Sequence, residues 1–268
     1  MTGVLTLATF RTAQARFALP AAAELMREHS GLRVRVVELM PVESVPAVRR
    51  REVDLAITYA YSFGTRDLPV GLASEFLGDD PLVLIAPAGL RDEVRRRGLA
   101  AVRDADWIAA RDGAPSIASV MFACREAGFA PRIQHRSGSF DAMAEMVAHG
   151  LGVAIVPEMS LSGDHRALVA CRVADSVRRV GVTYRQASAA RPAVAAAIRI
   201  LRSVDTPAGA GVLTPADVRR RRAWPPGRSR TAPAGSARCT RSGTTRGGAG
   251  SAPPRPRISP GPAGRRRA

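Results

Sequence analysis

The 268-residue chain is 46% hydrophobic and carries a formal net charge of +17, so it has enough apolar material for a folded core and is not a wholly disordered chain. The charge is unevenly spread, because residues 1–205 hold 26 arginines and 22 acids, whereas residues 206–268 hold 14 arginines and one acid. The first part is close to neutral and gives no reason to expect a polyanion as its partner.

The N-terminal part alternates short apolar strands with amphipathic helices, a pattern typical of a largely parallel sheet covered by helices. In chain order we predict strand Val4–Ala8, a helix that ends before Gly31, strand Arg33–Leu39, a short helix over Val45–Arg50 and strand Leu55–Tyr59. The apolar stripe of the first helix consists of Ala18, Ala22, Leu25 and Met26. This part is a β-α-β-α-β unit.

The next segment predicts a passage from one lobe to another. A loop over Ala60–Val70 is followed by strand Leu72–Leu77. Gly78–Pro81 then interrupts the strand, because Gly and Pro both disfavour a regular strand interior, and a second strand follows over Leu82–Ala86.

A second α/β series follows this passage. Its predicted elements are strand Trp107–Ala110, helix Ser116–Ala127, strand Arg132–Arg136, helix Phe140–Ala148 and strand Val153–Val156. Strands Leu168–Arg172 and Arg179–Tyr184 run back, and a last helix starts at Pro192. The domain is predicted to end near Val204.

The composition changes abruptly after Asp205. Gly and Pro supply 20 of the 63 residues from 206 to 268, and no hydrophobic period is present. Such a segment cannot bury a core, so we predict a disordered, basic, Arg/Pro/Gly-rich tail over 205–268. Its runs Arg219–Arg222 and Arg265–Arg267 suit contacts with nucleic-acid phosphates, but Trp224 is its one aromatic residue, which favours a solvated extension.

Hydroxyl side chains stand at the starts of three predicted helices that follow strands. They are Thr9 and Thr12, Ser116, and Ser137 and Ser139. Helix starts offer free N–H groups and a partial positive charge, and open α/β sheets bind ligands beyond the carboxyl ends of their strands. The sequence therefore indicates one anion-binding cleft. The alternative is that these residues only cap their helices, as Ser and Thr do in any protein.

Two larger side chains fall at the same strand ends. Arg11 lies in the first helical turn, where its guanidinium is placed to pair with an anionic ligand, and Tyr59 ends a strand and is placed to stack on a ligand. The alternatives are a solvated surface arginine and a tyrosine packed at the rim of the core.

No constellation typical of an enzyme is found. Gly150-Leu151-Gly152 lacks the third glycine of a dinucleotide loop and follows a helix, the reverse of the required order. GxSxG, HExxH and P-loop motifs are missing, and the four histidines lack metal-ligand spacing. Cys124 lies in an apolar helix and fits a buried thiol better than a nucleophile. We expect no catalytic residue, no metal and no cofactor.

The sequence also indicates a cytoplasmic protein. Its three cysteines show no CxxC spacing, and their odd number argues against a disulfide framework. The first residues lead directly into a strand, without the pattern of an export signal, and no apolar run is long enough to span a membrane.

Three segments together resemble the effector-binding domain of LysR-type transcriptional regulators. They are Gly3–Ala8, Val53–Ile57 and Ala148–Pro157, of which the last, Ala-His-Gly-Leu-Gly-Val-Ala-Ile-Val-Pro, is the most specific. The resemblance covers residues 3–204. It departs from the family at Ser30, where a proline is common, and at Arg51, where a glycine is common.

The resemblance implies an α/β fold with two Rossmann-like lobes of the periplasmic-binding-protein type II kind, joined by two crossover strands near Gly78–Pro81 and Ser176–Arg179. Lobe I would comprise residues 1–78 and 178–204, and lobe II residues 79–177. The effector would lie between the lobes. The positions that match the family's cleft turns are Thr9, Arg11, Thr12, Tyr59, Ser116, Ser137, Ser139 and Phe140.

The function implied is the sensing of a small anionic or aromatic effector in the regulation of transcription, by a homo-oligomer, with a dimer expected. Regulators of this family carry an N-terminal winged helix-turn-helix, whereas this sequence starts at the first strand of the effector domain. We therefore expect a truncated regulator that meets DNA only through a missing N-terminal domain. The alternatives are a free solute-binding protein of the same fold and an enzyme on the same scaffold.

Overall fold

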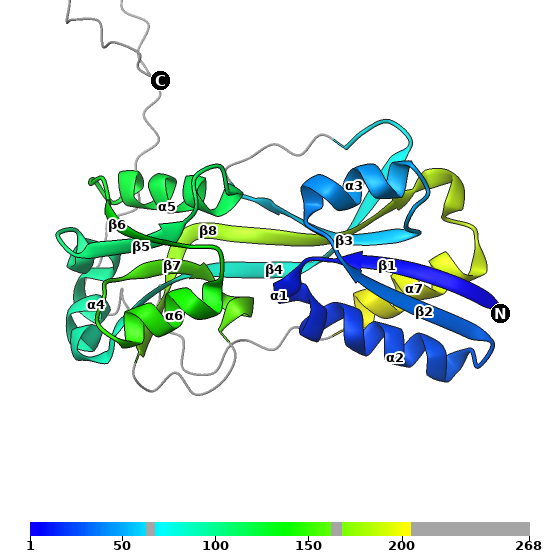
Figure 1. Cartoon of the computed structure of the whole chain (residues 1–268), viewed down its shortest axis with the longest axis horizontal. Helices are drawn as coiled ribbons and strands as arrows, with labels where there is room; N and C mark the ends of the chain where they lie inside the picture. Colours follow the sequence, from blue (N-terminus) through cyan, green and yellow to red (C-terminus); the bar gives the residue numbers. More distant parts are fainter. Residues whose placement is uncertain (63–67, 162–167, 205–268) are drawn as a thin grey trace, which may run out of the picture. The chain divides into compact units, whose positions relative to one another are not determined.

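The computed structural model describes residues 1–62, 68–161 and 168–204 and shows two α/β lobes joined by two long strands (Figure 1). These strands are β4 (Leu72–Pro87) and β8 (Leu168–Arg185), which confirm the predicted fold class. The first lobe, lobe I, carries β1–β3, α1–α3 and α7, and the second, lobe II, carries α4–α6 and β5–β7. The predicted tail over 205–268 lies outside the described residues.

Lobe I is built on three parallel strands with β1 in the middle. The strands are β1 (Gly3–Thr9), β2 (Leu32–Glu38) and β3 (Leu55–Tyr61). The helices are α1 (Arg11–Ala13), which continues through a π-helical turn (Gln14–Ala18) into α2 (Leu19–Glu28), then α3 (Pro41–Arg49) and α7 (Pro192–Ser203). Because the strands are parallel, their carboxyl ends meet at one edge of the sheet.

Lobe II repeats this plan with a smaller parallel pair. Its elements are α4 (Arg91–Arg97), β5 (Asp106–Ala110), α5 (Pro115–Glu126), β6 (Arg132–Ser137), α6 (Phe140–Ala148) and β7 (Ala154–Pro157). Strands β5 and β6 are parallel, whereas β7 is antiparallel to β4. The larger sheet has the order β2-β1-β3-β8-β4-β7, so β8 and β4 belong to both lobes.

The passage between the lobes is continuous strand, which corrects the predicted interruption at Gly78–Pro81. Strands β4 and β8 pair antiparallel from Leu72 opposite Arg185 to Pro87 opposite Leu168, except at Val173–Ser176 of β8. Asp79, Asp80 and Pro81 lie opposite Arg179, Arg178 and Val177. Register shifts lie on either side of this segment, after Phe76 and after Pro81, so Gly78 and Pro81 stand next to bulges and not within a long regular ladder. The predicted strands Leu168–Arg172 and Arg179–Tyr184 are likewise one strand.

Alternating residues of the shared strands face different cores. In β4, Leu82, Leu84 and Ala86 pack with α5, whereas Val83 and Ile85 pack with α6, as the twofold period of a strand requires. In lobe I, one core lies against α2 and α7 and a smaller one against α3. Both faces of the sheet are therefore covered by helices.

Three local predictions differ from the structure. The helix predicted over Val45–Arg50 begins at Pro41, because Pro suits the first turn and the Glu43 carboxylate accepts the Met40 N–H at 2.9 Å. Helix α4 was not predicted, since Val94 is its one buried residue and leaves no apolar period. Met26 lies beyond the buried face of α2 and is 45% exposed.

The turn between α6 and β7 depends on Gly152. Its φ is +147°, and a Cβ there would lie 2.3 Å from the Asp106 carbonyl oxygen. We expect Gly152→Ala to lower the free energy of unfolding by about 3 kcal/mol, because both backbone strain and a clash with backbone act. Urea unfolding measures the loss.

Gly89→Ala is the matched control, because open space surrounds a Cβ at that position. The two variants should differ clearly in their urea midpoints. Equal stability of both would contradict the assigned close approach of Gly152 to Asp106.

Candidate functional site

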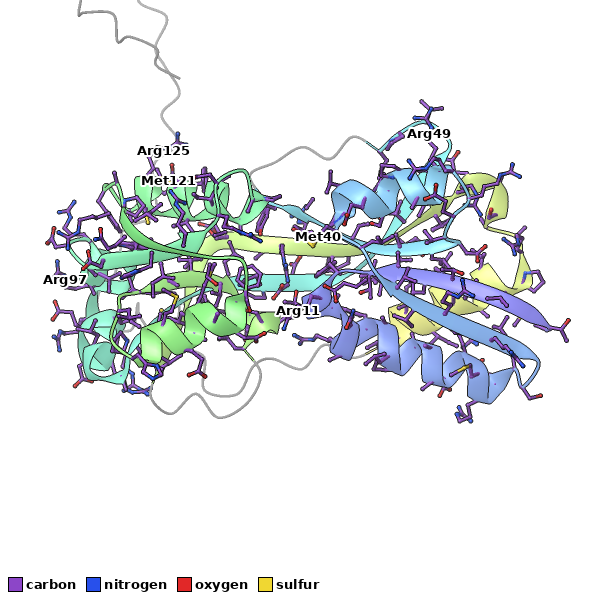
Figure 2. All side chains as sticks on the ribbon, viewed as in Figure 1. Arg11, Met40, Arg49, Arg97, Met121 and Arg125 are labelled. Carbon is purple, nitrogen blue, oxygen red and sulfur yellow. The ribbon has the colours of Figure 1, made fainter. Side chains whose placement is uncertain are left out.

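A cavity of about 290 Å3 lies where strand ends of both lobes meet. Lobe I lines it with residues that end or follow β1, β2 and β3, and lobe II lines it with residues that follow β5 and β6. Figure 2 shows two of these residues, Arg11 and Met40, between the lobes. The cavity occupies the place where open α/β sheets hold their ligands.

The structure brings seven of the eight predicted site residues to this one cavity. They are Arg11, Thr12, Tyr59, Ser116, Ser137, Ser139 and Phe140. They come from four separate chain segments of both lobes, so only the folded chain assembles them.

Thr9 is the exception, because it does not reach the cavity wall. It ends β1 with a fully buried side chain, and its hydroxyl donates to the Phe10 carbonyl oxygen at 3.3 Å. Thr12, one helical turn further on, lines the cavity instead. Thr9 therefore has a local structural role, and we do not retain it as a ligand contact.

The two serines before α6 form local hydrogen bonds as well as lining the cavity. The Ser139 hydroxyl accepts the Ala142 N–H at 3.4 Å, and the Ser137 hydroxyl accepts the Ser139 N–H at 3.2 Å. Ser116 differs, since its hydroxyl has no hydrogen bond among residues 1–62, 68–161 and 168–204. The capping interpretation thus holds for Ser139, whereas Ser137 supports the turn before α6 and Ser116 caps no helix.

The inner wall of the cavity holds a buried ion pair that the sequence analysis did not single out. Arg178 of β8 is 2% exposed and Asp80 of β4 is fully buried, and these two residues lie opposite each other in the strand ladder. The Arg178 Nε donates to Asp80 Oδ2 at 2.8 Å, and its Nη2 donates to the same oxygen. The Asp80 Oδ1 accepts the Met159 N–H at 2.9 Å.

Arg178 also fixes the lobe I side of the cavity. Its Nη2 donates to the Thr12 hydroxyl at 2.8 Å. Its Cζ lies 4.9 Å from the ring centroid of Phe10 and 4.7 Å from that of Tyr59, so the guanidinium contacts two aromatic faces. One side chain therefore connects both crossover strands with the first turn of α1.

The aromatic wall remains uncharged. The rings of Phe10 and Tyr59 meet edge to face with centroids 4.8 Å apart, and Tyr61 follows at 5.5 Å from Tyr59. Burial raises the pKa of the Tyr59 and Tyr61 phenols, although the nearby Arg178 opposes the rise. Both tyrosines therefore keep their protons and present neutral hydroxyls.

Burial likewise raises the pKa of the Asp80 carboxyl, which the Arg178 guanidinium and the Met159 N–H oppose. These partners are what keep a charged pair in a buried site.

One ion pair bridges the two lobes at the mouth of the cavity. Arg11 of α1 meets Asp141 in the first turn of α6 at 3.3 Å, and both side chains are more than half exposed. An exposed pair of this kind contributes little to stability. It does place a cation of lobe I and an acid of lobe II where a bound ligand would compete with them.

Comparison with known proteins identifies the family. The model of the LysR substrate-binding domain matches residues 1–206. The chain belongs to this family. Domains of this kind sense small-molecule effectors for LysR-type transcription regulators. No curated protein sequence matches the chain significantly.

Solved structures share the fold at low sequence identity. A C-terminal domain of a probable LysR family regulator from Rhodococcus sp. RHA1 is 20% identical, with a TM-score of 0.60 over 75% of this chain and 99% of that one. The regulatory domain of an OxyR2 variant from Vibrio vulnificus is 17% identical, with a TM-score of 0.62 over 76% and 96%. HinK, a LysR family regulator from Pseudomonas aeruginosa, is 18% identical, with a TM-score of 0.60 over 76% and 72%.

Other chemistries find little support in the described part of this LysR domain. It contains no group of three or more His, Cys, Asp and Glu side chains that could hold a metal ion. Cys124 is buried, and burial raises the pKa of its thiol to about 12, so the sulfur is not a ready nucleophile. No helix within these residues combines the length and the apolar character needed to cross a bilayer.

The Arg178–Asp80 pair should show strong coupling in a double-mutant cycle. Loss of either partner alone leaves a buried charge, so Asp80→Asn or Arg178→Met should each lower the free energy of unfolding by about 3 kcal/mol. The double variant should lose clearly less than the sum. Chemical unfolding of the four proteins measures the coupling.

The exposed pair Arg27–Glu24 supplies the control cycle, in which coupling should be small. If the Asp80 and Arg178 losses simply added, the pair would not act as a unit and the geometry of the inner wall would be wrongly assigned.

Proposed function

We propose that the cavity between the lobes is the effector site of this LysR substrate-binding domain and that it takes a small anionic or aromatic molecule. The observation that carries the proposal is the convergence of hydroxyls, arginines and aromatic rings from both lobes on one cavity of about 290 Å3. Arginine and hydroxyl groups suit an anion, and the wall of Phe10, Tyr59 and Phe140 suits a ring.

We propose that sensing works through the relation between the two lobes. A ligand that touches Thr12 in lobe I and Ser116 in lobe II is bound best when both lobes reach it, so it favours one arrangement of the lobes over others. Lobe I would comprise residues 1–78 and 178–204, and lobe II residues 79–177. In a regulator, this shift would pass through a homo-oligomer, with a dimer expected, to DNA held by a separate domain in the cytoplasm.

We infer a binding role without catalysis. The acids of the cavity wall are not placed as general bases, because Asp141 pairs with Arg11 and Glu38 forms no hydrogen bond with a hydroxyl of the described chain. A hydrolase or a lyase would need a general base free to reach the reacting atom.

Calorimetric titration of the full chain against small alkyl carboxylates and aromatic acids tests the proposal. At least one compound should bind, and Thr12→Ala and Ser139→Ala should each weaken that binding about threefold to tenfold, as expected for one lost hydrogen bond. Ser116→Trp should abolish binding, because it fills the cavity.

Ala118→Trp is the matched control, because Ala118 belongs to the same helix and does not line the cavity. Unchanged binding in Ser116→Trp, or failure of every acid to bind, would argue against this cavity as the effector site.

A further inference from the structure

Within the described part of the chain, two charged groups of the cavity wall form no ion pair. The other cations of the wall are paired, Arg178 with Asp80 and Arg11 with Asp141. Arg111 and Glu38 remain, and within the described ranges neither forms an ion pair. Arg111 belongs to lobe II and Glu38 to lobe I.

Strand register and a tight turn fix the place of Arg111. It directly follows β5, and Ala110 at the end of β5 lies opposite Ser137 at the end of β6. The Arg111 carbonyl oxygen accepts the Ala114 N–H at 3.1 Å, and Gly113 within this turn has a φ of +81°. Arg111 therefore lies beside Gly138 at the edge where β5 and β6 both end.

Gly138 provides the space that the Arg111 guanidinium occupies. A Cβ at Gly138 would lie 2.7 Å from Arg111 Nη2 and 3.2 Å from its Cζ. The φ of Gly138 is not in the left-handed region, so the backbone alone does not require glycine there. Glycine at this position instead leaves the space in which the Arg111 guanidinium lies.

Arg111 has no acceptor for its guanidinium in the part of the chain that the structure describes. The nearest candidate in sequence, Asp112, is engaged by Arg136 at 3.0 Å. A planar guanidinium with free donors matches a carboxylate in two parallel hydrogen bonds.

Glu38 offers the opposite chemistry on the other lobe. It ends β2 beside Thr9 of β1, and its Oε2 accepts the Gln14 amide N–H at 3.1 Å. No arginine among the described residues pairs with it. An ionised carboxylate only accepts hydrogen bonds, so a ligand group that reaches it must donate one.

We propose that the effector is a small molecule with a carboxylate at one end, bound by Arg111, and a cationic or other hydrogen-bond-donating group at the other end, directed to Glu38. The same cavity lining holds the rings of Phe10, Tyr59 and Phe140. This inference rests on the proposed function of the cavity and adds the ligand's class and orientation. A plain dianion is disfavoured, because its second charge would meet Glu38.

Calorimetric titration with matched probes tests the proposal on the full chain. The probes are 4-(aminomethyl)benzoate, which has both ends, 4-methylbenzoate, which lacks the amine, and 4-methylbenzylamine, which lacks the carboxylate. The aliphatic set 4-aminobutanoate, butanoate and butylamine repeats the comparison without a ring. In at least one set, the two-ended compound should bind about tenfold or more tightly than either one-ended compound.

Variants separate the two ends. Arg111→Gln should weaken binding of the two-ended probe about tenfold or more. The two-ended probe should then bind no more tightly than the one-ended amine. In Glu38→Gln, the two-ended probe should bind no more tightly than the one-ended carboxylate. Gly138→Ala keeps the charge of Arg111 but displaces the guanidinium, and it should weaken binding of the carboxylate end alone. Arg125→Gln and Glu145→Gln, on α5 and α6 outside the cavity wall, should change nothing.

The outcomes also separate this inference from the proposed function. Acid binding that is blocked by Ser116→Trp but unaffected by Arg111→Gln or Glu38→Gln would overturn the inference and leave the effector cavity standing. Tighter binding of the one-ended acids than of the two-ended probes would also overturn the inference and leave the effector cavity standing. If no probe binds while another acid from the wider titration does, the two-ended class is wrong. If no acid of any kind binds, both proposals fail.

Discussion

The hydrogen-bonded ion pair between Arg178 and Asp80 is the interaction on which the arrangement of the two lobes depends. Taking both charges out of water is costly, so the pair is tolerable only because neighbouring groups satisfy it. The Met159 N–H donates a hydrogen bond to the second carboxylate oxygen of Asp80. The Thr12 hydroxyl and two aromatic rings contact the Arg178 guanidinium. These partners belong to both lobes, and the pair itself joins the two crossover strands. A substitution at any of these residues should therefore alter the cavity wall.

The same interaction accounts for how charge is distributed in the cavity. Arg178 lines the wall but is committed to Asp80, and Arg11 is committed to Asp141 across the mouth. The charges left for a ligand lie at the strand ends, Arg111 after β5 and Glu38 at the end of β2. A neutral inner wall with opposite charges on the two lobes favours a ligand that spans the lobes, which is what an effector of a two-lobed sensor must do.

The sequence alone indicated a cleft at the strand ends, because Ser and Thr residues stand where predicted helices follow predicted strands. Thr12, Ser116 and Ser139 line one cavity, and their part in ligand binding stays a prediction. Thr9 does not line this cavity, since its position at the end of β1 turns its side chain into the core. The predicted break at Gly78–Pro81 was wrong, because these residues of β4 stay paired with β8 and the irregularities lie on either side of them.

The residues that the sequence did not reveal depend on long-range register. Asp80 and Arg178 lie 98 positions apart, and only the pairing of β4 with β8 brings them together. The available signal was an acid in one predicted crossover and an arginine in the other. Arg111 was one arginine among many, and its place becomes visible only through its packing over Gly138.

Amide hydrogen exchange with and without a bound acid tests most directly whether one ligand engages both lobes. The account predicts added protection together at Phe10–Thr12 in lobe I and at Ser137–Asp141 in lobe II, with none in the outer helix α4. Protection confined to one lobe, or spread evenly over the chain, would contradict it.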